Sequence, residues 1–215
     1  MYDLHTHSLL SDGELLPVEL IRRAAVLGYT TLGITDHVDA SNISQVIEAV
    51  MRVKDSSRHY GVDLICGVEI THVPPEEIPA LAREAKQEGA GLVIVHGETT
   101  VEPVAPGTNL AACTCADVDV LAHPGFITPE EAREAAKRDI ALEITARRGH
   151  NRTNGHVMQV ARLTGCRLVV DSDAHAPEDL MDENTRIVVG LGAGMTEEEC
   201  GFVLSQNINE WLQNR

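Results

Sequence analysis

Histidine and carboxylate side chains recur along this chain in short clusters whose spacing suits metal ions. The first cluster is His5-Thr6-His7, and a comparable one, Asp173-Ala174-His175, lies in the last quarter of the chain. Alternate residues of an extended segment point to the same side, so both members of each pair can reach one ion. The chemistry that such donor sets support is metal-assisted hydrolysis.

These clusters occur where predicted β-strands end. Short β-branched and leucine-rich runs predict strands over residues 1–4, 31–35, 64–68, 92–95, 118–122, 140–144, 168–171 and 187–189. Potential ligands at or just beyond their ends are His5, His7, Asp12, His37, Glu69, His96, His123, Asp173 and His175. Parallel barrel strands bring their carboxyl ends to one rim, so we expect these residues to converge. Their number exceeds what one four-coordinate ion needs and indicates two or three ions.

The segments between the predicted strands carry helix signals. Pro17 opens one helix, and Thr128 and Thr196 each begin a capping box with a glutamate three residues later. Strand and helix alternate in units of roughly 20–35 residues, which favours a parallel sheet. We therefore expect one domain over residues 1–215, folded as a small and irregular (β/α) barrel.

Composition bears on the partners of the protein. The 215 residues include 17 Lys and Arg against 33 Asp and Glu, a net charge of −16. Such a chain repels phosphate backbones and anionic membranes, so we expect no long nucleic acid and no membrane as partner. Aromatic residues make up 3% of the chain, few for platforms on which single strands stack. The sequence leaves the oligomeric state open.

The cysteines and the first residues bear on location. Five cysteines are an odd number for a disulfide framework, and Cys113 and Cys115 have no second pair with which to hold zinc. We expect free thiols in a reducing compartment. The start of the chain has no basic leader followed by an apolar stretch, and no apolar run is long enough to span a bilayer. A cytoplasmic location is the expectation.

The order of the motifs resembles that of the PHP family (polymerase and histidinol phosphatase). The matching motifs are His5-Thr6-His7, Ser11-Asp12-Gly13, Thr35-Asp36-His37, Gly67-Val68-Glu69, His96, His123-Pro124 and Asp173-Ala174-His175. The resemblance implies a distorted TIM-like (β/α)7 barrel of the PHP type with a trinuclear metal site. By the resemblance, the first ion would be held by His5, His7, Glu69 and Asp173. The second would be held by Glu69, His96 and His123, and the third by Asp12, His37 and His175.

A phosphatase follows from the resemblance together with the charge of such a site. Three divalent ions bring +6 and the ligands Asp12, Glu69 and Asp173 return −3, so the site attracts an anion. We expect a hydroxide bridging two ions to hydrolyse a small-molecule phosphate monoester, histidinol phosphate being the first substrate to test. Glu69, Asp173 and His175 are the predicted catalytic residues. Histidine donors favour zinc, and manganese or iron also fit.

An arginine-rich run, residues 147–152, follows the sixth predicted strand and should lie at the same rim. Arg147, Arg148 and Arg152 are candidates to grip a phosphate, and the alternative is a solvated loop paired with the acidic surface. Glu143, at the end of that strand, is a candidate to orient a ligand or the arginines. Three histidines outside the motifs receive no role: His59, His72 and His156.

Other functions fit the same set of ligands. The first alternative is a nucleotide phosphatase or nuclease of the same family. Nucleotide-cleaving members often carry an inserted domain, for which the segment between Glu69 and His96 leaves no room. The second alternative is an amidohydrolase-like enzyme, since metal-bound hydroxide also attacks carbonyl groups. The third is a non-enzymatic scaffold on the same fold, against which the complete ligand set counts.

Overall fold

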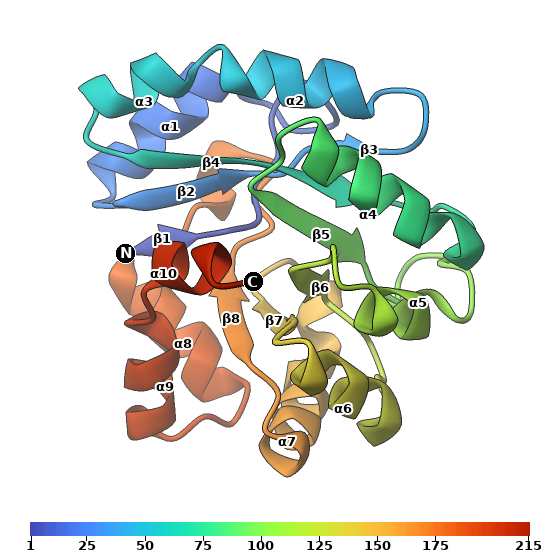
Figure 1. Ribbon diagram of the computed structural model, residues 1–215. Coiled ribbons are helices and arrows are strands. Elements are labelled where there is room, and N and C mark those ends of the chain that lie inside the picture. Colours follow the sequence, from blue (N-terminus) through green and yellow to red (C-terminus); the bar gives the residue numbers. More distant parts are fainter.

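A curled sheet of parallel strands forms the frame of the molecule (Figure 1). The computed structural model describes all 215 residues. The strands pair in the order β1-β2-β4-β5-β6-β7-β8, and the short β3 pairs with β4. Their bounds are Tyr2–Asp3 (β1), Thr31–Ile34 (β2), His37–Val38 (β3), Asp63–Ile70 (β4), Leu92–His96 (β5), Val120–Ala122 (β6), Ala141–Thr145 (β7) and Leu168–Asp171 (β8). Every ladder is parallel and the sheet nearly closes on itself, which confirms the predicted distorted TIM-like barrel.

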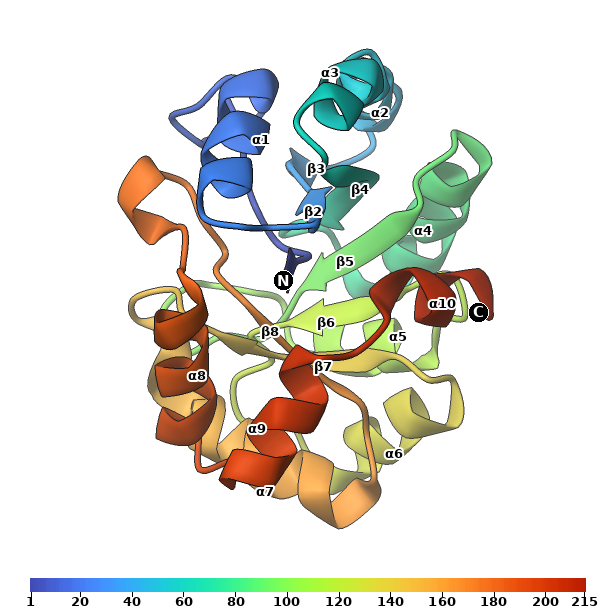
Figure 2. The ribbon, with the colours of Figure 1, turned by 90° about the vertical axis from the view of Figure 1, so that its left-hand side faces the viewer.

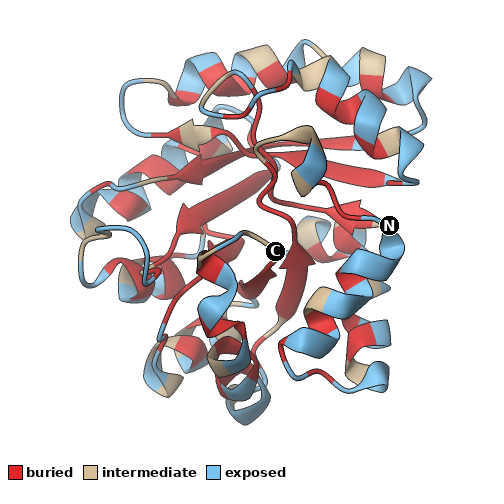
Figure 3. Cartoon of the chain, turned by 180° about the vertical axis from the view of Figure 1, so that it is seen from behind, coloured by how far each residue is buried: buried red, intermediate tan, exposed pale blue.

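Helices pack around the outside of the barrel, with their buried faces toward the sheet (Figure 3). The α-helices are Pro17–Val26 (α1), Ile43–Met51 (α2), Lys54–His59 (α3), Ile78–Gln87 (α4), Thr108–Thr114 (α5), Pro129–Lys137 (α6), Asn154–Thr164 (α7), Glu183–Gly192 (α8), Glu197–Leu204 (α9) and Ile208–Gln213 (α10). Short 3₁₀ helices span Pro75–Glu77 (η1), His150–Thr153 (η2) and Pro177–Asp179 (η3). The helix starts predicted at Pro17, Thr128 and Thr196 are confirmed, and both threonines form complete capping boxes.

Residues of one strand alternate between two apolar layers. Val93 and Val95 of β5 belong to the large cluster between sheet and helices, whereas Leu92 and Ile94 belong to a small cluster inside the barrel. The next residue of the inward set is His96, which ends the strand. The two-residue period thus brings a potential ligand to the mouth of the barrel, directly above apolar side chains.

The last helix closes the opposite end of the barrel, where the strands begin (Figure 2). Ile208 and Trp211 of α10 belong to the small inner cluster. Trp211 Nε1 donates to the carbonyl of Asp139 at 3.3 Å, and Arg215 donates to the carbonyl of Val118 at 2.7 Å; both acceptors precede strands. Only the end with the carboxyl termini of the strands is therefore left for a site.

The first and last strands meet through carboxylates rather than through a regular ladder. Leu4 N donates to Oδ1 of Asp171 at 2.8 Å, and Ser172 N donates to Oδ1 of Asp3 at 3.2 Å. Farther along, the backbone forms a parallel bridge between Thr6 and Ala174. This junction brings the histidine pair after β1 beside the Asp-His pair after β8.

One predicted strand is wrong, because residues 187–189 lie within α8. Asp182 caps this helix by accepting a hydrogen bond from Thr185 N at 2.7 Å, and Glu183 lies in the first turn. Val188 is 65% exposed, so the β-branched run has no sheet neighbour against which to pack. The N-cap therefore outweighs the β-propensity of the run.

The cysteines are all buried and none forms a disulfide, as their odd number predicts. Burial raises the pKa of the Cys166 thiol to about 12, so this thiol stays protonated and unreactive near neutral pH. The structure contains no helix with the length and apolar character needed to cross a membrane.

Gly33 provides a test of how closely β1 and β2 approach. A β-carbon at this position would stand 2.5 Å from the carbonyl oxygen of Leu4, a backbone atom that cannot move aside alone. We expect Gly33→Ala to lower the free energy of unfolding by about 1–3 kcal/mol, measured by denaturant titration. Gly192→Ala is the matched control, since a β-carbon there would meet nothing within 4 Å and alanine favours a helix. Wild-type stability for Gly33→Ala would contradict the close approach.

Candidate metal centre

The nine predicted ligand residues all lie at the end of the barrel where the strands terminate. His5, His7 and Asp12 follow β1, His37 begins β3, Glu69 lies in β4, His96 ends β5, His123 follows β6, and Asp173 and His175 follow β8. In each of them an imidazole nitrogen or a carboxylate oxygen lies within 4 Å of a carboxylate oxygen or an imidazole nitrogen of another residue at this end. The convergence expected from strand ends is therefore present.

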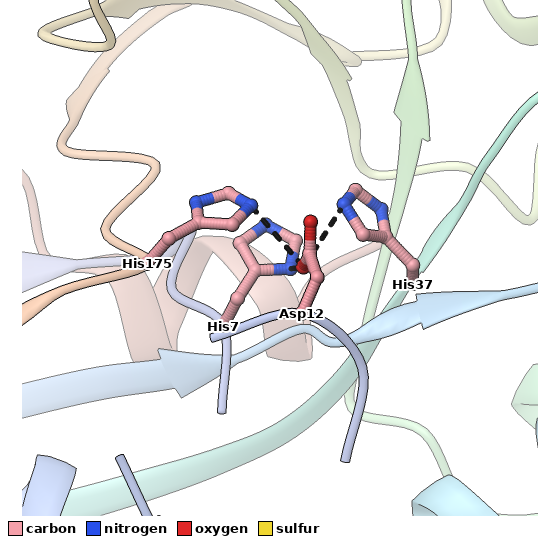
Figure 4. A group of neighbouring side chains, drawn as sticks. All are labelled: His7, Asp12, His37 and His175. Carbon is pink, nitrogen blue, oxygen red and sulfur yellow. Dashed lines mark ion pairs between the residues drawn. The ribbon is translucent and has the colours of Figure 1, made fainter. Parts of the chain in front are cut away.

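One group of donors surrounds Asp12 (Figure 4). Its Oδ1 lies 3.3 Å from Nε2 of His175, 3.4 Å from Nε2 of His37 and 3.9 Å from Nδ1 of His7. The other nitrogen of His7, Nε2, lies 3.3 Å from Oδ1 of Asp173. His7, which the resemblance assigns to the first ion alone, thus faces two groups of donors.

Glu69 is fully buried at the middle of the centre. Its Oε1 lies 3.4 Å from Nε2 of His5 and 3.7 Å from Nε2 of His123, while its Oε2 lies 2.7 Å from Nδ1 of His37 and 3.7 Å from Nε2 of His7. Each carboxylate oxygen therefore faces a different pair of imidazoles. This arrangement suits a carboxylate shared by two ions.

Asp173 and His123 leave their strands through left-handed backbone. Their φ angles are 53° and 26°, unusual for residues other than glycine. The turn places Oδ1 of Asp173 3.7 Å from Nε2 of His5, and Oδ2 of Asp173 3.6 Å from Nε2 of His123. Strained residues of this kind gather at functional sites, where the surrounding structure holds them in place.

Buried polar atoms without a hydrogen-bond partner are concentrated in this centre. They include Nε2 of His5, both ring nitrogens of His7, Oε1 of Glu69, and Nδ1 of both His123 and His150. Buried polar atoms are normally bonded, because leaving one unpaired costs about 1–3 kcal/mol. Imidazole nitrogens and carboxylate oxygens are ligands for zinc, manganese and iron. The donor set therefore fits divalent metal ions.

Carboxylates and imidazoles of the centre shift one another's pKa. Burial disfavours the charged carboxylate of Glu69, but His5 and His37 outweigh burial and hold its pKa well below the ordinary value. Burial likewise disfavours the charged forms of His5 and His37. Glu143 and Glu69 nevertheless raise the pKa of His5 well above its ordinary value. Glu69 raises the pKa of His37 to about 10. Burial lowers the pKa of His7 to about 4. Imidazole protons thus balance the carboxylates, and a divalent ion would displace such protons.

Two further carboxylates position the ligands. Nδ1 of His5 donates to Oε1 of Glu143 at 2.7 Å, and the backbone N of His123 donates to Oε2 of Glu143 at 2.8 Å. Asp36 accepts from the backbone N of Ser8 and from Oγ of Ser11, both at 2.7 Å, and so fixes the loop that carries Asp12. Carboxylates behind metal-binding histidines orient the rings and fix the tautomer. Glu143 thus has the contacts of a residue that orients a ligand.

A pocket of about 290 Å³ opens onto the centre and has no apolar residue in its lining. Its lining comprises Asp12, His37, Thr71, His72, His96, Glu102, His123, Arg147, His150, Asp173 and His175. A larger cavity of about 630 Å³ lies between Met1, α8 and α9, and none of the predicted ligands lines it. The smaller, entirely polar pocket is therefore the candidate site.

Four of the lining residues, Thr71, His72, Glu102 and His150, are not among the predicted site residues. Oε2 of Glu102 lies 3.0 Å from Nε2 of both His72 and His96, and Oε1 lies 3.3 Å from Nε2 of His150. Glu102 belongs to an irregular segment that folds back over the mouth, which no spacing in the sequence predicts. A signal existed for His150, since it lies in the arginine-rich run that was predicted to reach the rim.

The three candidate arginines occupy different environments. Arg147 lines the pocket, and its Nη1 donates to Oδ2 of Asp179 at 3.1 Å. Arg148 and Arg152 are not part of the pocket lining. Arg147 is thus the one positioned to meet a ligand bound at the centre.

Comparison with known proteins gives matches along the whole chain. A sequence model of the PHP domain matches residues 3–102. An uncharacterized protein of Methanocaldococcus jannaschii is 51% identical over 214 residues, which cover 99% of this chain and 98% of the relative. Ribonuclease P protein component 3 of Methanosarcina barkeri is 26% identical over 214 residues, covering 93% of this chain and 83% of the relative. A 5′-3′ exoribonuclease of Haemophilus influenzae is 43% identical over 70 residues, 33% of this chain and 23% of that enzyme.

Solved structures share the fold. A chain in a structure of archaeal ribonuclease P with mature tRNA superposes with a TM-score of 0.74 at 15% identity, covering 100% of this chain and 90% of that chain. A Listeria monocytogenes structure with a provisional histidinol phosphatase assignment gives a TM-score of 0.60 at 11% identity, covering 86% of this chain and 99% of that chain. At such identities the likeness concerns the fold alone, so histidinol phosphate gains no support as substrate.

These matches correct the expectation about partners. The resemblance predicted a small phosphorylated substrate and net charge predicted no long nucleic acid, but two of the matches are with ribonuclease P, one of them in a structure that contains tRNA. The prediction is wrong because a charge of −16 summed over the chain does not describe the field at one mouth of the barrel. There, arginines 147, 148 and 152 follow β7 and metal ions would add further positive charge.

The PHP-domain match covers most of the motif pattern. The match begins at residue 3 and includes the five motifs from the first histidine pair to His96. The remaining two motifs, at His123 and at Asp173, lie against the same buried carboxylate and imidazoles. This chain therefore belongs to the PHP family.

Proposed function

We propose that the protein is a metal-dependent phosphoesterase that hydrolyses a phosphate ester at an RNA end or on a nucleotide. The observation that carries this proposal is the buried carboxylate of Glu69, which lies among the imidazoles of His5, His7, His37 and His123 beneath a wholly polar pocket. A purely structural cluster of this kind would leave several buried nitrogens unbonded, at a cost that ions would remove.

The ligand residues divide as the family pattern assigns them. His5, His7, Glu69 and Asp173 would hold one ion, Glu69 would join it to a second held by His96 and His123, and Asp12, His37 and His175 would hold a third. When bound, such ions acidify water and neutralise charge on phosphate oxygens. Glu69, Asp173 and His175 act by holding these ions against the substrate. Zinc is the first ion to test, followed by manganese and iron.

The side chains around the pocket indicate what part of a substrate is recognised. The pocket has about 290 Å³ and no apolar wall, near the lower limit for small-ligand sites. It fits a phosphate and an attached sugar, and has no apolar wall against which a base would pack. Arg147 at its edge can bind phosphate oxygens in a bidentate manner. A terminal nucleotide enters such a pocket, whereas a duplex stays outside it.

The relatives favour a nucleotide substrate over other phosphate esters. Two of them are named for RNA: the M. barkeri component of ribonuclease P, which matches over most of its length, and the H. influenzae exoribonuclease, which matches over 70 residues. The second candidate function is RNA binding without hydrolysis, favoured by the match with a ribonuclease P component over most of both chains. Phosphate release from RNA separates the two candidates.

A substrate panel tests the reaction. Protein loaded with zinc, manganese or iron is incubated with 5′-phosphorylated oligoribonucleotides, nucleoside bisphosphates and histidinol phosphate, and released phosphate and nucleotides are measured. We expect turnover with the nucleotide substrates and little with histidinol phosphate, because the pocket offers contacts to phosphate and sugar. Binding of the oligoribonucleotide without any cleavage would support the second candidate and refute the phosphoesterase.

Metal content tests the centre itself. The purified protein should hold two to three ions per chain by elemental analysis. Glu69→Gln keeps the shape but removes a shared negative charge, so we expect loss of at least one ion and a rate reduced by roughly a hundredfold or more. Glu88→Gln, an exposed position at the end of α4, is the matched control. Full metal content and turnover in Glu69→Gln would rule out a shared ligand at this position.

Arg147→Ala tests the substrate contact. We expect weaker substrate binding and weaker inhibition by inorganic phosphate, by roughly ten- to a hundredfold each, the effect of about 1.5–3 kcal/mol for a charged hydrogen bond. Metal content should stay unchanged. Arg133→Ala, on the surface of α6, serves as control, and Arg148→Ala and Arg152→Ala show whether longer RNA makes contacts outside the pocket. Unchanged phosphate inhibition in Arg147→Ala would remove this residue from the site.

A further inference from the structure

His150 lies in the centre although no motif of the family pattern includes it. Its side chain is 7% exposed, and its ring centroid is 4.3 Å from that of His123 and 5.9 Å from that of His96. One ligand nitrogen from each of these three histidines can be chosen so that all lie within 4.8 Å of one another. Three buried imidazoles at such spacing can bind one ion together.

The backbone around His150 is built to place this ring. Gly149 has φ of 95°, a conformation that L side chains rarely adopt, and it turns the chain after β7 into η2. The 3₁₀ helix then begins at His150 itself, and the helix α7 continues from it. The ring is therefore held by regular structure at the rim.

The hydrogen bonding of His150 is incomplete. Nε2 lies 3.3 Å from Oε1 of Glu102, but Nδ1 is buried and has no partner. Nδ1 of His123 is also buried without a partner. A hydrogen bond to Glu102 needs only Nε2 of His150. Burying the second nitrogen, Nδ1, without a partner costs about 1–3 kcal/mol, and the contact with Glu102 does not explain that cost. An ion bound between the rings accounts for the burial.

Glu102 reaches these rings from an anchored segment. Oε1 of Glu98 accepts from the backbone N of Gly107 at 3.0 Å and of Asn109 at 2.9 Å, which ties the two ends of the segment together. Between them, the Glu102 carboxylate lies 3.0 Å from Nε2 of His96 and 3.3 Å from Nε2 of His150. On His150 the carboxylate faces Nε2 and leaves Nδ1 free for an ion, and a carboxylate in that place keeps the ring oriented and raises its basicity. On His96 the nitrogen with another partner is Nδ1, which lies 3.2 Å from the carbonyl oxygen of Gly97.

We propose that His150 is an additional ligand of the ion held by His96 and His123, and that Glu102 positions the imidazole of His150. This inference rests on the metal-dependent function proposed above and extends it beyond the nine family positions. With three imidazoles, the ion has the donor set of a three-histidine zinc site and binds more tightly than with two. The arginine-rich run thus contributes a metal ligand as well as Arg147.

Metal retention tests this inference without any measurement of activity. Wild type, His150→Ala and His150→Gln are loaded with zinc, and ion content is followed by elemental analysis during titration with a chelator. We expect both variants to lose one ion at chelator concentrations at least roughly tenfold lower than wild type, and to hold the others normally. Glu102→Gln should weaken the same ion by about ten- to a hundredfold, the usual effect of removing an outer partner. His59→Ala removes an exposed histidine at the end of α3 and is the matched control.

Cobalt substitution gives an independent readout. The visible absorption of bound cobalt(II) depends on its ligands, so we expect the spectrum of His150→Gln to change while that of His59→Ala stays as in wild type. Thermal unfolding after chelation verifies the fold, because the variants should then match wild type and differ only when loaded. Wild-type chelator resistance and spectrum in both His150 variants would overturn this inference and leave the phosphoesterase intact. A wild-type protein that binds no ion would overturn both.

Discussion

The burial of Glu69 is the constraint around which the mouth of the barrel is organised. A carboxylate removed from water needs positive charge beside it, and here that charge comes from imidazoles, since no lysine or arginine pairs with Glu69. Imidazole is the cation that gives up its proton most readily near neutral pH. Neutral imidazoles and ionised carboxylates are also the forms that bind metals. The same groups that make burial of Glu69 tolerable are therefore ready to exchange protons for ions.

A second layer of buried carboxylates lies beneath the ligands, and its surroundings shift the pKa of these groups in the opposite direction to that of Glu69. Burial raises the pKa of Glu143 and, more strongly, that of Asp171, the residue that joins β8 to β1. The pKa of Asp3 beside it is shifted in the same direction, also by burial. Burial thus makes these carboxylates easier to protonate than ordinary ones, whereas the imidazoles beside Glu69 shift its pKa the other way. The lower carboxylates serve as hydrogen-bonding supports for the strand ends and for the ligands above them.

Much of this arrangement could be predicted from the sequence because strand geometry is regular. The pairs His5-x-His7 and Asp173-x-His175 follow predicted strands, and parallel strands bring their ends together whatever the intervening helices do. The failures have local causes. Residues 187–189 have the composition of a strand but follow a strong helix cap at Asp182. Glu102 reaches His96 only because its segment folds back, which depends on the contacts of Glu98 and not on spacing. Net charge misled about nucleic acid because it averages over the surface.

The two ends of the barrel consequently differ in what holds them. At the amino end, Trp211 packs into the inner apolar cluster and its indole N–H has an acceptor. At the carboxyl end, His123 and Asp173 adopt left-handed backbone that costs roughly 1–3 kcal/mol each, and several buried nitrogens are unbonded. Such unfavourable free energies persist only when another interaction offsets them. Binding of metal ions would involve the side chains of His123 and Asp173 together with the unbonded nitrogens. The strain and the unpaired atoms are thus located where bound ions would supply the missing free energy. Stability and activity of this barrel would then depend on the same metal centre, because the residues that destabilise its mouth are those that prepare it to bind.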